Sequence, residues 1–249
     1  GLVYEGRKVL LYCPRCETPI SNFEVAMDNS YKDITEKSVY VKFKIKSPLP
    51  PFVKGGNSVY ILAWTTTPWT LPGNLALAVG EKLEYVLLKM KNPPSPSPRF
   101  AGEAGLYQGG AAQGGESYIL AKERLSIIDG EYEIMKELKG KDLVDLEYEP
   151  LFDVPAFKES GKKVYYLAAA DFVTTDEGTG VVHTAVVYGE DDYNLGLKLD
   201  LPVIPALDNK GHFNDTVPQF KGVYFLKANK LIIKDLDKRG LLFKAEDYK

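Results

Sequence analysis

Residues 39–46 have the sequence Val-Tyr-Val-Lys-Phe-Lys-Ile-Lys, in which apolar side chains occupy every second position. Val39, Val41, Phe43 and Ile45 fall on one face of an extended chain, and three lysines and a tyrosine fall on the other. A period of two predicts a half-buried β-strand. Seven further segments rich in Val, Ile, Leu and Tyr are strand candidates: 58–67, 75–79, 84–90, 117–120, 163–168, 180–187 and 223–226.

Helical patterns are fewer. Residues 121–128 are one candidate, and 229–239 carry apolar residues at helical spacing before Gly240, which suits a helix C-cap. The segment after Gly189 fits a strand or a helix by spacing, but the carboxylates at 190–192 favour a helix start because they suit the positive end of the helix dipole. Many short strands and a few helices predict an α+β fold, a β-rich, barrel-like domain with peripheral helices.

The composition sets broad limits on function. The 249 residues suffice for one domain spanning 1–249, and a formal charge of −3 argues against a tight, stand-alone RNA-binding protein. A module that meets only the end of an RNA stays open. We find no apolar run of the roughly 20 residues that a membrane span needs, and no signal peptide, so no membrane partner is expected. The two cysteines, Cys13 and Cys16, lie too close together to staple a secreted fold, which favours the cytoplasm.

Residues 91–116 differ from the rest of the chain. Four prolines are followed by repeated Gly, Ala and Gln with few large apolar groups. Such a segment gains little from burial to offset the entropy lost on ordering. It is predicted to be a mobile, low-complexity surface insertion. The chain also begins at Gly1 rather than at methionine, so we expect it to be a piece of a longer protein.

A threonine-rich segment at 64–74, Trp-Thr-Thr-Thr-Pro-Trp-Thr-Leu-Pro-Gly-Asn, is the first candidate for chemistry. Pro68 lacks an amide donor and should end the preceding strand. In an extended backbone Thr65 and Thr67 project to one side and Thr66 to the other. Hydroxyls clustered at a strand end can orient a water or bind an ester oxygen. The alternative is that threonine simply suits strands and turns.

The second candidate is 178–193, Gly-Thr-Gly-Val-Val-His-Thr-Ala-Val-Val-Tyr-Gly-Glu-Asp-Asp-Tyr. His183 should lie mid-strand, and Asp191 and Asp192 should lie at a helix start. An ionised aspartate there could bind an ammonium group while the imidazole lines the same pocket. The alternatives are a hydrogen-bonded packing histidine and an ordinary helix N-cap.

The third candidate is Cys13-Pro14-Arg15-Cys16. Its spacing suits a zinc knuckle, but a closed structural zinc site needs four ligands, and His212 would still leave it one short. Redox chemistry lacks the usual strand-then-helix context. We interpret Cys13 and Cys16 as half of a zinc site whose other ligands lie beyond Lys249.

Together these three segments resemble the editing insertion of isoleucyl-tRNA synthetases, which are class I aminoacyl-tRNA synthetases. The string at 64–72 is similar to that family's threonine-rich motif, and 178–183 with 189–193 is similar to its second motif. Valyl and leucyl relatives typically have Thr-Thr-Arg-Pro where this chain has Thr-Thr-Thr-Pro, and they lack the histidine. One departure is Val186, where the family usually has proline. The resemblance covers the chain except 91–116, and it makes 1–30 a half zinc-knuckle stem joined to the synthetase body.

The resemblance implies hydrolytic proofreading of misacylated tRNA, that is, deacylation of valyl-tRNA(Ile) with exclusion of isoleucine. Valyl-adenylate is a second conceivable substrate. One methylene discriminates by only about 1–3 kcal/mol, a limit for which isoleucyl-tRNA synthetases are themselves the standard illustration. A second, smaller site then hydrolyses the valyl product that the first, synthetic site cannot exclude. Two alternatives are a non-catalytic module that binds the tRNA acceptor end, and the editing domain of a valyl or leucyl synthetase.

The resemblance also implies a role for each residue. Asp192 binds the α-ammonium group of the misattached amino acid, and His183 forms part of the wall that admits valine and clashes with isoleucine. Hydrolysis then rests on positioning a water and on hydrogen bonds to developing oxyanion charge. The ester and this water are held by a catalytic cluster of Thr65, Thr66 and Thr67, and the adenosine side of the pocket is shaped by Trp69 and Asn74.

The implied cofactors and partners are few. Editing needs no cofactor, zinc is expected at the cysteine pair only with ligands outside this fragment, and ATP and Mg are used by the full-length enzyme elsewhere. The partners are the 3′ end of aminoacylated isoleucine tRNA and the remainder of the synthetase chain. A monomer is expected.

Overall fold

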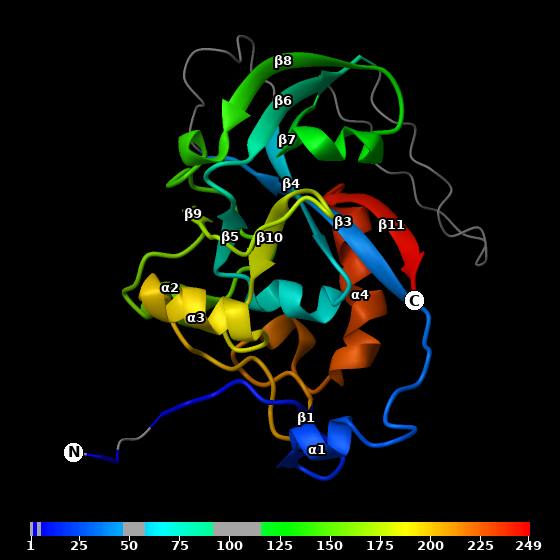
Figure 1. Cartoon of the computed structure of the whole chain (residues 1–249), viewed down its shortest axis with the longest axis vertical. Coiled ribbons are helices and arrows are strands. Elements are labelled where there is room, and N and C mark those ends of the chain that lie inside the picture. The colour runs from blue at the N-terminus through cyan, green and yellow to red at the C-terminus, as the bar shows by residue number, and fades with distance from the viewer. Residues whose placement is uncertain (1, 4–5, 47–57, 92–115) are drawn as a thin grey trace.

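The computed structural model describes residues 2–3, 6–46, 58–91 and 116–249 (Figure 1). Within them the strands are β1 Tyr12–Cys13, β2 Thr18–Pro19, β3 Glu36–Lys44, β4 Val59–Thr65, β5 Ala76–Val79, β6 Glu84–Met90, β7 Ser117–Ala121, β8 Tyr132–Lys139, β9 Tyr166–Ala169, β10 Val181–Thr184 and β11 Leu242–Tyr248. The α-helices are α1 Asn22–Val25, α2 Pro155–Glu159, α3 Glu190–Lys198 and α4 Phe225–Lys238, and the 3₁₀ helices are η1 Pro68–Gly73, η2 Lys122–Ile127, η3 Gly140–Asp142 and η4 Pro218–Phe220. None of these helices is long and apolar enough to cross a membrane.

The centre of the fold is β4, because three strands pair with it. β3 is antiparallel to β4, β7 is parallel to it, and β10 joins it through the parallel pair Val182 and Trp64. The sheet runs β8-β6-β7-β4-β10-β5-β9, and β11 pairs with the outer edge of β3. It curls into a half-barrel with few helices, which lie around it (Figure 1). The predicted β-rich, barrel-like α+β fold is confirmed.

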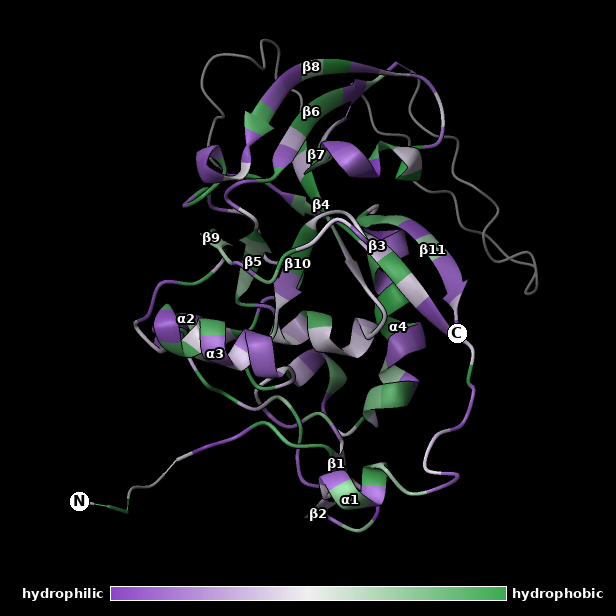
Figure 2. Cartoon of the chain, viewed as in Figure 1, coloured by the Kyte–Doolittle hydropathy of each residue, from purple (hydrophilic) through white to green (hydrophobic). Residues whose placement is uncertain are grey.

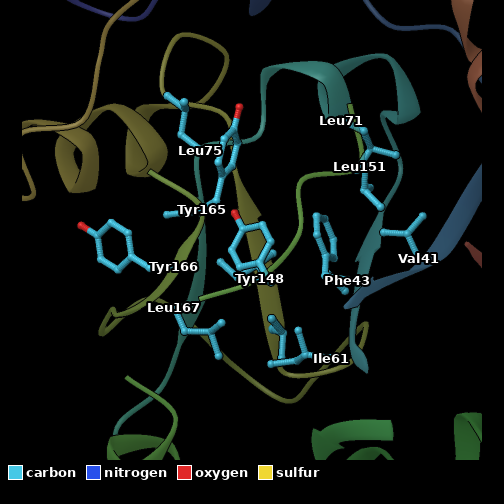
Figure 3. Close-up of a cluster of buried hydrophobic side chains, with 14 of the residues drawn as sticks. Val41, Phe43, Ile61, Leu71, Leu75, Tyr148, Leu151, Tyr165, Tyr166 and Leu167 are labelled. Carbon is cyan, nitrogen blue, oxygen red and sulfur yellow. The ribbon is translucent and has the colours of Figure 1, made fainter. Parts of the chain in front are cut away.

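The main core fills the hollow of this sheet. Figure 3 shows side chains from β3, from β4 and from the segments after η1 pointing toward one another. Phe43 packs edge-on against Tyr148, with ring centroids 5.2 Å apart, and Ile61, Leu71 and Leu75 are at most 2% exposed. Each such side chain contributes roughly 1.5–3 kcal/mol by leaving water. Since Leu71 lies within η1, this burial holds the threonine-rich segment against the sheet.

The prediction that β3 is half-buried is wrong for its second face. Val39, Val41 and Phe43 are fully buried as expected, but Lys42 is only 7% exposed. Its ammonium group forms an ion pair with Glu116 at 2.8 Å and lies 5.1 Å from the ring centre of Tyr60. A buried lysine is tolerated only with such a partner.

Two other predictions of secondary structure are wrong. Within 121–128, Lys122–Ile127 form the 3₁₀ helix η2 instead of an α-helix, and Arg124 has non-helical backbone angles at a kink. The guanidinium of Arg124 reaches across to the carbonyl oxygen of Gly178 at 2.8 Å, and this contact accompanies the kink. Residues 223–226 are not a strand, because α4 begins at Phe225. Their apolar run instead starts the helical face that buries Ala228 and Ile232.

The remaining strand candidates are found at or near their expected places, although β10 ends at Thr184 rather than at 187. The helices α3 and α4 are also found, and Gly240 follows α4 with a φ of +68°, as a C-cap glycine should. β8 and β11 were not predicted. Hydrophilic and hydrophobic residues alternate irregularly along both (Figure 2). Of the predicted insertion at 91–116, residues 92–115 lie outside the described residues.

Candidate functional site

The threonines form a row of hydroxyl groups at the end of β4. The hydroxyl oxygens of Thr65 and Thr67 lie 3.2 Å apart, and the amide of Thr67 donates to the hydroxyl of Thr65 at 3.1 Å. The row continues to Thr70, whose hydroxyl oxygen is 3.3 Å from that of Thr67. Thr65 and Thr70 are buried and Thr67 is exposed, so the middle member of the row is the one that reaches the surface. The expected shared side for Thr65 and Thr67 is confirmed.

Thr66 lies outside this row. It is half-buried, and within the described residues its hydroxyl makes no hydrogen bond to another side chain. Thr70, by contrast, was missed by the sequence reasoning. The signal was available, because Pro68 can begin a helical turn, and such a turn brings position 70 back toward position 67.

His183 connects the threonine row to β10. Its Nε2 atom lies 2.9 Å from the hydroxyl oxygen of Thr70, and its residue pairs with Leu77 of β5. The hydroxyl of Thr70 donates its single proton to the carbonyl oxygen of Thr67 at 2.8 Å. The tautomer that satisfies both contacts therefore carries the imidazole proton on Nε2. Nδ1 is then a bare acceptor, buried without a hydrogen-bond partner in the described part of the chain.

Burial keeps this imidazole neutral. His183 is 8% exposed, and desolvation lowers its pKa to about 4. The ring is therefore an uncharged part of the site at neutral pH. It can form part of the surface of a binding site or act as a hydrogen-bond partner. A role as a positively charged imidazolium would require protonation well above its lowered pKa.

Asp192 lies in the first turn of α3, the helix that follows β10 in the chain. Burial, followed by repulsion from Asp191, raises the pKa of Asp192 to about 7, and a hydrogen bond from the amide of Ala185 opposes this rise. Ala185 is only two residues beyond His183. A Cβ atom at Gly189 would lie 2.4 Å from the carboxylate of Asp192. A residue with a side chain at 189 would therefore collide with this carboxylate in its present position.

Trp69 lies beside the hydroxyl row in an aromatic cluster. Its ring packs edge-on against Tyr188 and Phe225, with centroid distances of 4.8 Å and 4.9 Å. Its amide donates to the side chain of Asn229 in α4 at 2.9 Å. Trp69 remains half-buried, so part of the residue is accessible from outside.

Asn74 is not brought to the surface with Trp69. It is 4% exposed, and its amide nitrogen donates to the carbonyl oxygen of Ala76 at 2.9 Å. Its carbonyl oxygen accepts from the hydroxyl of Tyr148 at 2.6 Å. The geometry therefore gives Asn74 an internal role and supplies no contact surface for an adenosine.

The Gly-Thr-Gly string before His183 has a structural explanation. Gly178 and Gly180 have φ values of +64° and +72°, which side chains other than glycine rarely adopt. A Cβ atom at Gly180 would also lie 2.4 Å from that of Ala121. Thr179 is buried and donates to the carbonyl oxygen of Leu62 at 2.7 Å. The string sets the entry into β10 and so the position of His183.

The cysteine pair lies apart from these residues, in the N-terminal ribbon of β1 and β2. Hydrogen bonds from the backbone and the side chain of Cys16 lower the pKa of Cys13. Within the described residues, no group of three or more His, Cys, Asp and Glu side chains could hold a metal ion. Two thiols do not complete a zinc site, and the zinc prediction still requires ligands from elsewhere.

Comparison with known proteins places the chain in a family. A family model described as tRNA synthetases class I (I, L, M and V) matches residues 1–240. An isoleucine–tRNA ligase of Clostridium acetobutylicum is 42% identical over 247 residues, and one of Wolbachia pipientis wMel is 40% identical over 267 residues. The alignments cover 99% and 100% of this chain but only 20% and 24% of those proteins. The chain thus spans a fifth to a quarter of the length of these relatives.

Solved structures with the same fold include the editing domains of leucyl-tRNA synthetases. The editing domain of the P. knowlesi cytosolic leucyl-tRNA synthetase has a TM-score of 0.55 at 15% identity and covers 86% of this chain and 97% of that domain. The structure described as GlLeuRS-CP1 has a TM-score of 0.57 at 14% identity, with 85% and 100% covered. At such identities the likeness establishes the fold. With the family match over residues 1–240, the chain belongs to the class I tRNA synthetases (I, L, M and V) and has the fold of their editing domains.

Proposed function

We propose that this chain is a hydrolytic proofreading domain that deacylates valyl-tRNA(Ile) and excludes isoleucine. The observation that carries the proposal is the continuous contact from the threonine row through Thr70 to His183, with Asp192 in α3, the next helix along the chain, and its carboxylate beside Ala185. Hydroxyl groups of η1 and a neutral imidazole of β10 are in contact, and the carboxylate of α3 is proposed to face the same site. The likeness to leucyl-tRNA synthetase editing domains supports this reading.

Asp192 recognises the α-ammonium group of the esterified amino acid. Burial makes its carboxylate costly to ionise, and an incoming ammonium group offsets this cost and lowers the pKa of Asp192. The amide of Ala185, which lowers the pKa of Asp192, is proposed to orient the carboxylate before the substrate arrives. Recognition of an ammonium group also distinguishes an aminoacyl ester from a peptidyl ester.

The hydroxyl row holds the ester and the attacking water. Thr67 is the exposed member and donates to or accepts from a water at the ester, while Thr65 and Thr70 fix its hydroxyl from behind. Catalysis then rests on positioning and on hydrogen bonds that strengthen as charge develops on the ester oxygen. Thr66, which projects from the opposite face of the strand to Thr65 and Thr67, is proposed to contact the ester as well.

Rejection of isoleucine is assigned to His183. The hydrogen bond to Thr70 and the burial of the ring prevent the imidazole from turning away when a larger side chain enters. A rigid wall converts one extra methylene into a steric clash, whereas a mobile one would yield. This explains why the ring is neutral and held rather than free to titrate.

The natural substrate is the 3′ end of aminoacylated isoleucine tRNA, and the remainder of a synthetase chain is the second partner. Exposed apolar side chains gather in the N-terminal segment, where Leu10, Leu11, Phe23 and Tyr31 are at least 50% exposed. Exposed apolar patches of this kind mark interaction surfaces. The stem is therefore proposed to lie against the rest of the synthetase.

The test is to mix the chain with valyl-tRNA(Ile) and follow the release of valine. Asp192→Ala should lower kcat/KM by about 10²-fold, because a charged hydrogen-bond partner is lost. Asp191→Ala is the matched control, since its carboxylate is exposed and adjacent, and it should retain most of the activity. His183→Ala should accelerate hydrolysis of isoleucyl-tRNA(Ile) relative to valyl-tRNA(Ile). A wild-type rate no faster than spontaneous hydrolysis would exclude the function.

A further inference from the structure

We propose that Tyr148 is a positioning residue for the editing reaction, which it serves by holding Asn74 at the end of η1; the inference rests on the proposed function. Nothing in the sequence motifs points to Tyr148. It is fully buried, and its hydroxyl donates to the side-chain oxygen of Asn74 at 2.6 Å.

Asn74 makes three hydrogen bonds inside the fold, one through its backbone amide and two through its side chain. Its backbone amide donates to the carbonyl oxygen of Leu71 at 3.1 Å and ends η1. Its side-chain nitrogen donates to Ala76 at the start of β5, and its side-chain oxygen accepts from Tyr148. The asparagine therefore ties the last turn of η1 to the first residue of β5.

This tie determines how the two halves of the site meet. Thr70 lies on η1, whereas His183 lies on β10 and pairs with Leu77 of β5. The chain between η1 and β5 consists of Asn74 and Leu75, and the amide of Leu75 donates to the carbonyl oxygen of Thr184 at 2.9 Å. A rotation at this two-residue link would change the 2.9 Å contact between Thr70 and His183 directly.

Tyr148 is suited to hold the link because it is itself fixed on several sides. Its ring packs against Phe43 and Tyr165, with centroid distances of 5.2 Å and 6.2 Å (Figure 3). Its amide donates to the carbonyl oxygen of Tyr165 at 3.0 Å, and the amide of Tyr165 donates to the carbonyl oxygen of Leu75 at 2.7 Å. Burial raises the pKa of the Tyr148 hydroxyl well above its usual value, so the group stays protonated and remains a donor.

Tyr148→Phe tests the inference, because it removes one hydroxyl and keeps the ring. Tyr118→Phe is the matched control: Tyr118 is 1% exposed and its hydroxyl bonds to Glu116, in a separate core cluster. Both variants should keep the far-UV circular dichroism of the wild type. Asn74→Ala removes the other half of the same hydrogen bond and provides a second variant.

The first readout needs no activity. The chain has two tryptophans, so a Trp64→Phe background leaves Trp69 on η1 as the reporter. Tyr148→Phe and Asn74→Ala should each shift the emission of Trp69 and increase its quenching by acrylamide, and Tyr118→Phe should change neither. Unchanged Trp69 emission in Tyr148→Phe, or an equal change in Tyr118→Phe, overturns the inference.

The second readout is the deacylation of valyl-tRNA(Ile). Tyr148→Phe should lower kcat by about 10-fold with little change in KM, because the reacting groups are misplaced while the ammonium site is intact. The double variant with Asn74→Ala should be no slower than Asn74→Ala alone, since both act through one contact. If the two substitutions instead lower kcat independently, so that their fold-losses multiply in the double variant, the inference is overturned. An inactive wild-type chain would remove the proposed function, whereas the Trp69 readout would still decide whether Tyr148 holds η1.

Discussion

Replacing Asp192 by asparagine should stabilise the fold and, under the proposed function, lower kcat/KM for valyl-tRNA(Ile) by about 10²-fold. The change keeps an oxygen that can accept from the amide of Ala185, and it removes a charge that burial makes unfavourable. The pKa of Asp192 rises from 3.8 to about 7 in the folded chain, a difference of about 3. At about 1.4 kcal/mol for each pKa unit, the ionised carboxylate costs roughly 4 kcal/mol. Because the side chain is partly exposed, screening by solvent reduces this to roughly 2 kcal/mol.

The dependence on pH gives the sharper test. A carboxyl group with a raised folded-state pKa contributes stability that is fully present below pH 3.8 and is lost as the pH rises through about 7. Urea unfolding of wild type and Asp192→Asn should therefore show a gain of roughly 2 kcal/mol at pH 8.5 that shrinks toward zero at pH 4.5. Asp191→Asn, which changes an exposed carboxylate, should give a smaller gain. A variant that is less stable than wild type at pH 8.5, or a gain that is equal at both pH values, would refute the reasoning.

Three further predictions concern parts of the chain described above. Gly180→Ala should lower the free energy of unfolding by at least about 2 kcal/mol in thermal unfolding, because φ is +72° and a Cβ atom would clash with Ala121. Gly161→Ala is the control: φ is +71° but the space around it is open, so the loss should be smaller. The imidazole proton NMR signals of His183 should not move between pH 8 and pH 5, since its pKa is lowered to about 4; a midpoint near 6.5 would contradict a buried neutral ring. Lys42→Ala should destabilise the fold by roughly 3–5 kcal/mol in urea unfolding because Glu116 loses its partner, and Lys42→Ala combined with Glu116→Gln should recover part of that loss.

Local patterns were sufficient for the central strands and for one part of the site. Alternation along 39–46 identified β3, and the strand geometry of 64–67 placed Thr65 and Thr67 on one side. These features depend on neighbours within a few residues. The same holds for α3, where three consecutive carboxylates suit a helix start.

Contacts between distant residues could not be predicted from these patterns. The burial of Lys42 depends on Glu116, and the internal role of Asn74 depends on Tyr148; in both cases the partner is 74 residues later. The contact of Thr70 with His183 requires η1 and β10 to be assembled first. β8 was missed because it is an edge strand whose mostly exposed residues give no burial pattern.

The pairing of β3 with β11 has a consequence for synthesis on the ribosome. Val41 of β3 pairs with Leu242, so one whole edge of β3 stays unpaired until a strand about 200 residues later in the sequence has been synthesised. At about 5–20 residues per second, this delay lasts roughly 10 to 40 seconds. During that interval an apolar strand has unsatisfied backbone donors and acceptors, the condition under which nascent chains pair with one another. Completion of the half-barrel is thus a late event in the synthesis of this domain, and chaperone protection of the emerging β3 edge would matter most before Leu242 appears.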